Sequence, residues 1–249
     1  APCYGPAVSR SLVFITGGSS GIGLAMARTI PFDDVQIYDI SRRGTDDFDH
    51  IAADLSNPES WDILGDFLLQ QMHEYSGERV VFAHCAGTLT PIGFAGEVGG
   101  QAYKRNVLLN SAAPQVLGDA FLEAAQQTRA QCHLILISSG AADSVYTGWT
   151  SYGAGKAAVN QWVRAAGAEQ ALRGDHCRIL AVRPGVVATA MQTEIRNTPA
   201  EHFPQLARFK EMYEQGELLD PEKVARDIWS LLDREIPNGA VLDLQDFAA

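Results

Sequence analysis

The feature that most constrains the fold is a glycine-rich stretch between an apolar run and a helical pattern. The stretch reads T-G-G-S-S-G-I-G from Thr16 to Gly23, after the apolar run Leu12 to Thr16 and before a helical pattern from Leu24 to Ile30. Glycines at such a turn permit positive φ and let backbone N–H groups approach a phosphate, which the positive end of the helix stabilises. The spacing differs from the commoner G-x-G-x-x-G pattern and lacks the lysine of a P-loop. It predicts a βα unit that binds a phosphate-bearing ligand.

Short apolar runs alternate with longer helical patterns along the rest of the chain. This alternation predicts an α/β fold: one doubly wound parallel sheet of about seven strands with helices on both faces. The predicted strands are Leu12–Thr16, Val35–Ile40, His50–Ala53, Val80–His84, His133–Ser138, Arg178–Val182 and Val241–Leu244. Neither a linker nor an internal repeat interrupts the pattern, so we expect a single domain over residues 11–249 after an N-terminal extension, 1–10.

Capping residues mark several helix starts. Asn57 precedes Pro58, and Asp220 precedes Pro221, which predicts a helix from each proline. A long alanine-rich helix is predicted from Ser151 to Leu172. Residues 191–216 form an irregular segment rich in Met, Phe and Arg, and a segment of this length in a compact domain is typical of a functional lid. The alternative is two short amphipathic helices that complete the core.

Composition limits the classes of partner. A hydrophobic share of 46% supports a sizeable core, and a formal net charge of −11 without a basic patch argues against nucleic-acid binding. The chain contains no apolar run long enough to span a membrane, and residues 1–10 lack the apolar stretch of a signal peptide, so we expect a cytoplasmic protein. Cys3, Cys85, Cys132 and Cys177 are scattered without metal-site spacing, so we expect no metal and reduced thiols, the last three as small buried hydrophobes.

Three further motifs, together with the glycine stretch, resemble the short-chain dehydrogenase/reductase family over nearly the whole chain. Ser139 precedes Tyr152 by 13 positions, Tyr152 and Lys156 form Y-x-x-x-K, and P-G-V-V-A-T runs from Pro184 to Thr189. The resemblance implies a Rossmann-type fold and an oxidoreductase that uses a nicotinamide cofactor on C=O or CH–OH groups.

The candidate catalytic residues have physically defined roles. Tyr152 and Lys156, four apart on a helix, share one face, and a nearby ammonium favours the phenolate and lowers the pKa of tyrosine. Tyr152 then serves as general acid, and Ser139 stabilises the charge on the substrate oxygen. The resemblance implies that Lys156 also holds the ribose hydroxyls. Ser138 is a rival for Ser139, and the family spacing favours Ser139.

The family's fourth catalytic residue is an asparagine, and Asn106 and Asn110 are both candidates. Pro114 has no N–H, so the carbonyl of Asn110 lacks its i+4 partner and is free to hold a water. We therefore predict Asn110 as catalytic and Asn106 as structural.

One motif departs from the family pattern. The usual Asn-Asn-Ala-Gly appears as His84-Cys85-Ala86-Gly87, which still offers the backbone of Ala86 and Gly87. His84 could replace the hydrogen bonds of the missing asparagine, and we expect it to be a hydrogen-bonded core histidine rather than a catalytic one.

The cofactor prediction is NADP(H) rather than NAD(H). The discriminating position falls on Ser41, and Arg42 follows it; a hydroxyl and a guanidinium suit a 2′-phosphate. Asp39 is the competing signal, since it could reach a ribose if the strand register slipped. The predicted cofactor-binding residues are Gly17, Ser19, Ser20, Gly21, Ile22, Gly23, Ser41, Arg42, Asp54, Leu55, Ala86, Gly87, Tyr152, Lys156, Pro184, Gly185, Val187 and Thr189.

Further motifs are Thr90-Pro91-Ile92 with Ala95-Gly96-Glu97, Ser139-Gly140-Ala141-Ala142, Tyr146 with Gly148-Trp149, and Thr189-Ala190-Met191-Gln192 with Ile195-Arg196. On these residues the chain resembles, within the family, the benzil reductase and sepiapterin reductase-like group. The resemblance implies a carbonyl reductase for bulky aromatic ketones or vicinal diketones, with Tyr146, Trp149, Met191 and Phe203 as candidate pocket residues, and a homodimer or homotetramer. One alternative is a 3-oxoacyl-thioester reductase, whose acidic carrier protein a surface at −11 would repel. The other is a non-catalytic cofactor-binding regulator, which would not need the four catalytic residues.

Overall fold

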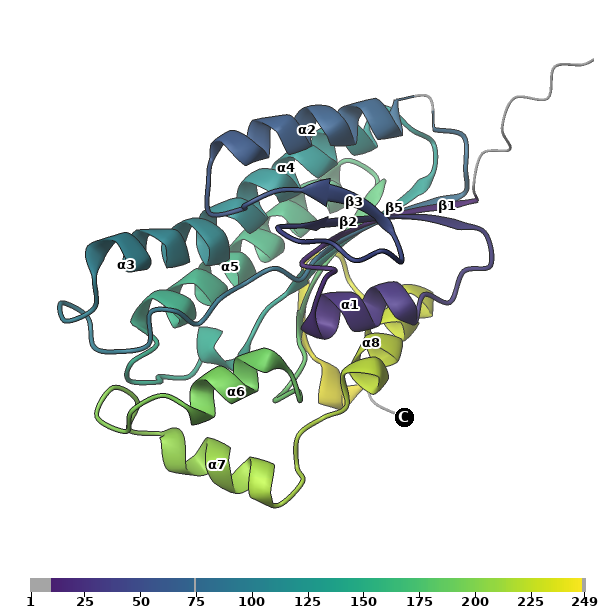
Figure 1. Cartoon of the computed structure of the whole chain (residues 1–249). Coiled ribbons are helices and arrows are strands. Elements are labelled where there is room, and N and C mark those ends of the chain that lie inside the picture. Colours follow the sequence, from purple (N-terminus) through teal and green to yellow (C-terminus); the bar gives the residue numbers. More distant parts are fainter. Residues whose placement is uncertain (1–9, 74, 248–249) are drawn as a thin grey trace, which may run out of the picture.

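A computed structural model describes residues 10–73 and 75–247. Its centre is an all-parallel sheet in the order β3-β2-β1-β4-β5-β6-β7 (Figure 1). The strands are β1 (Ser11–Thr16), β2 (Val35–Ser41), β3 (Asp49–Ala52), β4 (Arg79–His84), β5 (Gln131–Ile137), β6 (Cys177–Arg183) and β7 (Ala240–Asp243). The predicted fold class is therefore confirmed, with strand ends shifted by one or two residues.

Both faces of the sheet are apolar because side chains alternate along each strand. In β1, Leu12 and Phe14 contact one core cluster, while Val13 and Ile15 contact the other. The helices that cover the two faces, together with those at the carboxyl edge, are α1 (Gly21–Arg28), α2 (Glu59–Met72), α3 (Gly100–Val107), α4 (Ala113–Ala125), α5 (Thr150–Leu172), α6 (Ala190–Arg196), α7 (Leu206–Glu214) and α8 (Pro221–Ser230). Helices α2, α4 and α5 lie on one face and α1 and α8 on the other (Figure 1).

The strand order reverses beside β1. The chain runs outward through β2 and β3 on one side of β1, and through β4 to β7 on the other. The loops that leave the carboxyl ends of β1 and β4 therefore part from each other and open a crevice, which is where ligands bind in open α/β sheets.

Local expectations about the helices are met in part. The Asp220 carboxylate accepts a hydrogen bond from the Lys223 N–H (2.8 Å) and caps α8, as predicted. Helix α2 begins at Glu59, one residue after Pro58, and Asn57 Oδ1 accepts from the Glu59 N–H (3.3 Å). The expectation that residues 191–216 are irregular is wrong, since this region contains α6 and α7, whose buried side chains Ile195, Leu206 and Phe209 anchor it to the domain.

The cysteines and the helices bear on two further expectations. Cys132 and Cys177 are buried and free, as expected, whereas Cys85 is free but only partly buried, and Cys3 lies outside the described residues. Within the described ranges, no helix combines the length and apolarity needed to cross a membrane.

Candidate active site

A cleft of about 1050 Å³ runs across the carboxyl edge of the sheet. All the predicted cofactor-binding residues line it, and so do Ser139, Tyr152 and Lys156. Asn110 does not line the cleft: it is fully buried behind Gly87 and Gly155, glycines at which an added Cβ would come within 3.0 Å of its side chain. The structure thus brings together predicted residues that are up to 172 positions apart in the sequence, from Gly17 to Thr189, with Asn110 directly behind the wall.

The glycine-rich turn has the backbone geometry of a phosphate cradle. Gly17 and Gly21 have φ of 71° and 54°, a region that disfavours a side chain. A Cβ on Gly23 would lie 2.4 Å from the Gly17 carbonyl oxygen, so only glycine permits this close turn. The buried Thr16 hydroxyl accepts from the N–H groups of Cys85 and Ala86 (3.1 Å each), which joins the cradle to the loop after β4. The cradle therefore fits the pyrophosphate of a dinucleotide at the N-terminus of α1.

Ser139, Tyr152 and Lys156 meet at the centre of the cleft. Ser139 follows the end of β5, while Tyr152 and Lys156 lie one turn apart on α5. The hydroxyl of Ser139 hydrogen-bonds that of Tyr152. Lys156 is buried, and its Nζ donates to the Ile137 carbonyl (2.8 Å), which leaves two ammonium protons for a ligand.

Burial controls the titration of this site. It raises the pKa of Tyr152, and the hydrogen bond with Ser139 opposes the rise. It lowers the pKa of Lys156 to about 8. The expectation that the Lys156 ammonium lowers the pKa of Tyr152 is therefore wrong. The Lys156 Nζ lies 5.8 Å from the centre of the Tyr152 ring, and it donates to the Ile137 carbonyl rather than to the phenol oxygen.

The helix that carries Asn110 is distorted around that residue. Residues Leu108–Ala112 form a π-helical turn between α3 and α4, just before Pro114, whose missing N–H cannot close the ordinary helical bond. The Asn110 side chain donates to the Thr88 carbonyl (2.8 Å) and accepts from the Thr88 N–H (3.1 Å). Asn110 therefore fixes the loop after β4, directly behind the cleft wall beside Lys156.

The rival residues have structural contacts. The Ser138 hydroxyl donates to Asn160 Oδ1 (2.5 Å), so it is committed to α5. Asn106 is fully buried, and its Nδ2 donates to the Thr90 carbonyl (2.9 Å). Asn110 is equally buried and belongs to the same network, since its Nδ2 donates to Asn106 Oδ1 (3.0 Å).

His84 contradicts both sequence-based expectations. It is buried, yet neither ring nitrogen has a hydrogen-bond partner among the described residues. It is therefore neither a hydrogen-bonded core histidine nor a replacement for the asparagine of the family motif. Burial and the Lys156 charge lower the pKa of His84 to about 3, so the ring is neutral and packs against Phe82.

The end of β2 distinguishes the two cofactor signals. Asp39 is fully buried, its carboxylate accepts from the Ser41 hydroxyl (2.9 Å), and it lies against Gly18. Ser41, Arg42 and Arg43 line the cleft, and Asp39 does not. The register pairs Ile15 with Asp39 without a slip, so the carboxylate supports the glycine turn from beneath.

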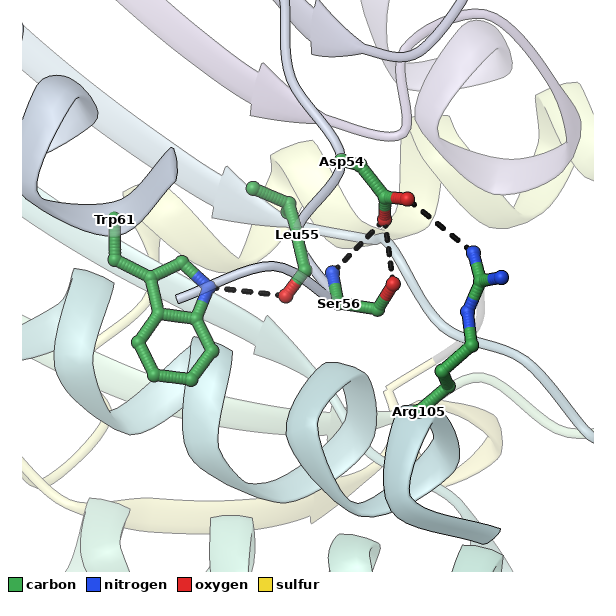
Figure 2. Close-up of polar contacts among 5 residues, drawn as sticks. All are labelled: Asp54, Leu55, Ser56, Trp61 and Arg105. Atoms are coloured by element: carbon green, nitrogen blue, oxygen red, sulfur yellow. Dashed lines mark hydrogen bonds and ion pairs between the residues drawn. The ribbon is translucent and has the colours of Figure 1, made fainter. Parts of the chain in front are cut away.

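The loop after β3 is held by the network in Figure 2. Asp54 accepts from the N–H and hydroxyl of Ser56 (3.0 and 2.7 Å) and from Arg105 (3.2 Å), and the Leu55 carbonyl accepts from Trp61 (2.9 Å). Burial acts to raise the pKa of Asp54, but the Ser56 hydrogen bonds and the charges of Arg105 and Arg42 lower it on balance. This loop forms a fixed, charged wall at the end of the cleft next to Arg42.

The opposite end of the cleft is aromatic. Tyr146, Trp149, Met191 and Phe209 line it, with the Trp149 ring edge-on to Tyr152 at 5.7 Å. Phe203 was predicted to line the pocket, but it is fully buried behind Trp149, where the two rings stack at 4.6 Å. Phe209 lines the cleft instead, because α7 turns that ring toward it.

Several residues that line the cleft were not assigned a role from the sequence. Arg105 reaches Asp54 from α3, and Thr90 donates a short hydrogen bond to Glu194, which joins the loop after β4 to α6. Gln192 is buried at the same end. Thr90 and Gln192 occur in motifs that resemble the benzil reductase and sepiapterin reductase-like group, but those motifs assigned them no role, since only the fold brings α3 and α6 to the cleft.

Known proteins match this chain over most of its length. The model of the family "short chain dehydrogenase" matches residues 11–200. A benzil reductase ((S)-benzoin forming) of Bacillus cereus is 30% identical over 246 residues, 94% of this chain and 99% of that protein. Sepiapterin reductase of Bos taurus is 34% identical over 115 residues, 45% of this chain and 41% of that protein.

A solved structure supports the same assignment. The crystal structure of the KRED1-Pglu enzyme is 25% identical and superposes with a TM-score of 0.76, covering 93% of this chain and 100% of that one. The predicted resemblance to the benzil and sepiapterin reductases is thus confirmed. Given the family match over residues 11–200 and the cleft described above, this chain belongs to the short-chain dehydrogenase/reductase family, oxidoreductases that use a nicotinamide cofactor on C=O and CH–OH groups.

Proposed function

We propose that the protein is an NADPH-dependent carbonyl reductase for bulky aromatic ketones and vicinal diketones. The observation that carries the substrate class is the aromatic end of the cleft, where the rings of Tyr146, Trp149 and Phe209 lie next to the Tyr152 hydroxyl end of the site. Such a surface binds aromatic groups by apolar burial and ring stacking. The benzil reductase of Bacillus cereus, similar over nearly its full length, supports the same class.

The preference for NADP(H) rests on the other end of the cleft. Arg42 and Arg43 line it together with Ser41, and guanidinium groups bind a phosphate by charge-assisted hydrogen bonds. Two acids lie near this position: Asp39 is directed under Gly18 and accepts from Ser41, and Asp54 is engaged by Ser56 and Arg105. The cleft therefore offers cations to a 2′-phosphate and no free carboxylate to a 2′-hydroxyl.

The residues of the chain divide the chemistry among them. When bound, the nicotinamide supplies the hydride. Tyr152 donates its proton to the carbonyl oxygen, and Ser139 hydrogen-bonds the same oxygen and stabilises its developing charge. Lys156 holds the ribose hydroxyls with the protons that Ile137 leaves free, and Asn110 fixes the wall behind it.

The position of α6 and α7 gives them a role as a cover. Met191 and Phe209 bring apolar surface over the catalytic centre, and closure there would exclude water and strengthen the hydrogen bonds from Tyr152 and Ser139. We propose that residues 191–216 close over the substrate after it binds.

The test is the oxidation of NADPH by the purified protein with benzil and with butane-2,3-dione. We expect benzil to be preferred at least tenfold in kcat/KM, since burial of an aromatic ring contributes roughly 1.5–3 kcal/mol. Equal efficiency with the two diketones would remove the aromatic substrate class. Reduction of 3-oxoacyl thioesters in preference to both would replace it.

A further inference from the structure

The aromatic end of the cleft contains a polar side chain that has no role in the mechanism above. Gln192 lies in α6, lines the cleft and is 2% exposed. Neither its Nε2 nor its Oε1 has a hydrogen-bond partner among the described residues. Buried amides are nearly always hydrogen-bonded, because burial removes their hydrogen bonds to water and leaving those bonds unreplaced costs free energy. The unpaired carboxamide of Gln192 therefore indicates that a bound ligand forms hydrogen bonds with it.

The helix places Gln192 toward the catalytic centre. Ile195, three residues later on the same face of α6, belongs to the buried cluster that includes Tyr152 and Trp149. Met191, the preceding residue, packs against the same cluster. Gln192 is thus flanked along α6 by residues that contact the aromatic wall beside Tyr152.

Two other polar side chains near this end are already engaged. Thr90 donates to Glu194, and Thr147 donates to Gln205 (2.9 Å). The Trp149 Nε1–H, on the same wall, is also buried and also lacks a hydrogen-bond partner within the described part of the chain. The aromatic end is therefore apolar in its walls but retains a donor and an acceptor on Gln192 and a donor on Trp149.

We infer that Gln192 is a specificity-determining residue that binds the second oxygen of a vicinal diketone or α-hydroxy ketone. This inference rests on the proposed function. Ser139 and Tyr152 take the oxygen at the reacting carbon, so an oxygen on the neighbouring carbon needs a separate donor within the same pocket. The Gln192 amide donates to a carbonyl oxygen there when the substrate is a diketone, and it accepts from a hydroxyl there when the substrate is an α-hydroxy ketone. A simple ketone leaves the buried amide unpaired, which penalises its binding.

The experiment compares benzil with deoxybenzoin, which has the same two rings and a methylene in place of the second carbonyl. Gln192→Met keeps the length and volume of the side chain but removes the hydrogen bonds. We expect kcat/KM for benzil to fall by about tenfold or more and kcat/KM for deoxybenzoin to change by less than about threefold. The comparison of the two ratios, variant against wild type, cancels the different intrinsic reactivities of the two ketones.

Two further variants keep the test decisive. Gln192→Leu also removes both hydrogen-bonding groups of the amide, so it should lose benzil activity selectively as well. Gln215→Met makes the matched change on the exposed end of the same segment, where Gln215 contacts Glu211, and should change neither substrate. The KM for NADPH should stay constant in all three.

The outcomes separate the two proposals. Equal losses for benzil and deoxybenzoin in a folded Gln192→Met protein would overturn the role of Gln192 while the proposed function stands. A rise in the KM for NADPH with both ketones would assign the amide to the cofactor and overturn it too. A wild-type protein that reduces neither ketone would overturn the proposed function and this inference together.

Discussion

The two ends of the cleft are built from different kinds of sequence. The cofactor end consists largely of contiguous stretches, the turn from Thr16 to Gly23 and the run from Ser41 to Arg43, and it works through backbone N–H groups and charges. The substrate end is assembled from the loop after β4, the residues before α5, and helices α6 and α7. Its surface is made of packed side chains. The nicotinamide cofactor, which is used throughout the family, is thus bound largely by local sequence motifs. The substrate, which differs between members, is bound by a surface that only tertiary packing creates.

The largest expected effect concerns the residue shared by both ends. Tyr152→Phe should lower kcat about 10²–10⁴-fold, because general acid catalysis contributes on that order, while the affinity for NADPH stays nearly unchanged. Steady-state kinetics and a cofactor titration by fluorescence measure both quantities. More than about a tenth of wild-type turnover in this variant would exclude Tyr152 as the acid.

The next effect distinguishes the cofactor end. Arg42→Ala should weaken NADPH binding about 10- to 150-fold and leave NADH binding nearly unchanged, since a charge-assisted bond to the 2′-phosphate contributes about 1.5–3 kcal/mol. Titration of both cofactors checks this, with Arg226→Ala on the exposed face of α8 as control. Equal weakening for both cofactors would show that Arg42 does not read the 2′ position, and Asp39 would then be the residue to substitute.

A smaller effect is expected at the substrate end. Glu194→Ala removes the hydrogen bond from Thr90 that joins α6 to the loop after β4. We expect the KM for benzil to rise about two- to tenfold and amide exchange in residues 190–214 to become faster, since one hydrogen bond at an exposed site contributes about 0.5–1.5 kcal/mol. Glu211→Ala, on the exposed side of α7, is the matched control. Unchanged exchange in residues 190–214 would show that this contact does not hold the cover in place.

The last prediction concerns the pKa of Lys156 and its effect on stability rather than the reaction rate. Burial lowers the pKa of Lys156 to about 8 from its usual 10.5, so the unfolded chain binds this proton more tightly than the folded protein does. The buried Lys156 ammonium therefore lowers the free energy of unfolding below about pH 8. This destabilisation disappears as the pH rises from about 8 to 10.5. With four lysines in the chain, the ε-carbon resonances can be followed by NMR, and Lys156→Met assigns the signal. A midpoint near 10.5 for that signal would contradict burial as the dominant influence.

Where prediction from sequence failed, the cause was a contact between distant segments. Asn110 was chosen over Asn106 because Pro114 removes a specific N–H, an effect confined to one helix, whereas the π-helical turn at Leu108–Ala112 was not predicted. The lack of hydrogen-bond partners for the His84 ring could not be predicted from the sequence, because it depends on which side chains of other elements pack beside β4. Phe203 and Phe209 are indistinguishable in the sequence, and only the turn of α7 decides which ring meets the cleft.

The sequence by itself determined the doubly wound sheet, the glycine cradle and the pairing of Tyr152 with Lys156. These depend on the alternation of side chains along strands, on backbone conformations that only glycine adopts, and on the one-turn spacing within a helix, all of which are local. Only the tertiary structure decided the direction of Asp39, the bond between Thr90 and Glu194 and the unpaired amide of Gln192. Their surroundings come from segments far away in the chain, and burial and hydrogen bonding act through space rather than along the sequence.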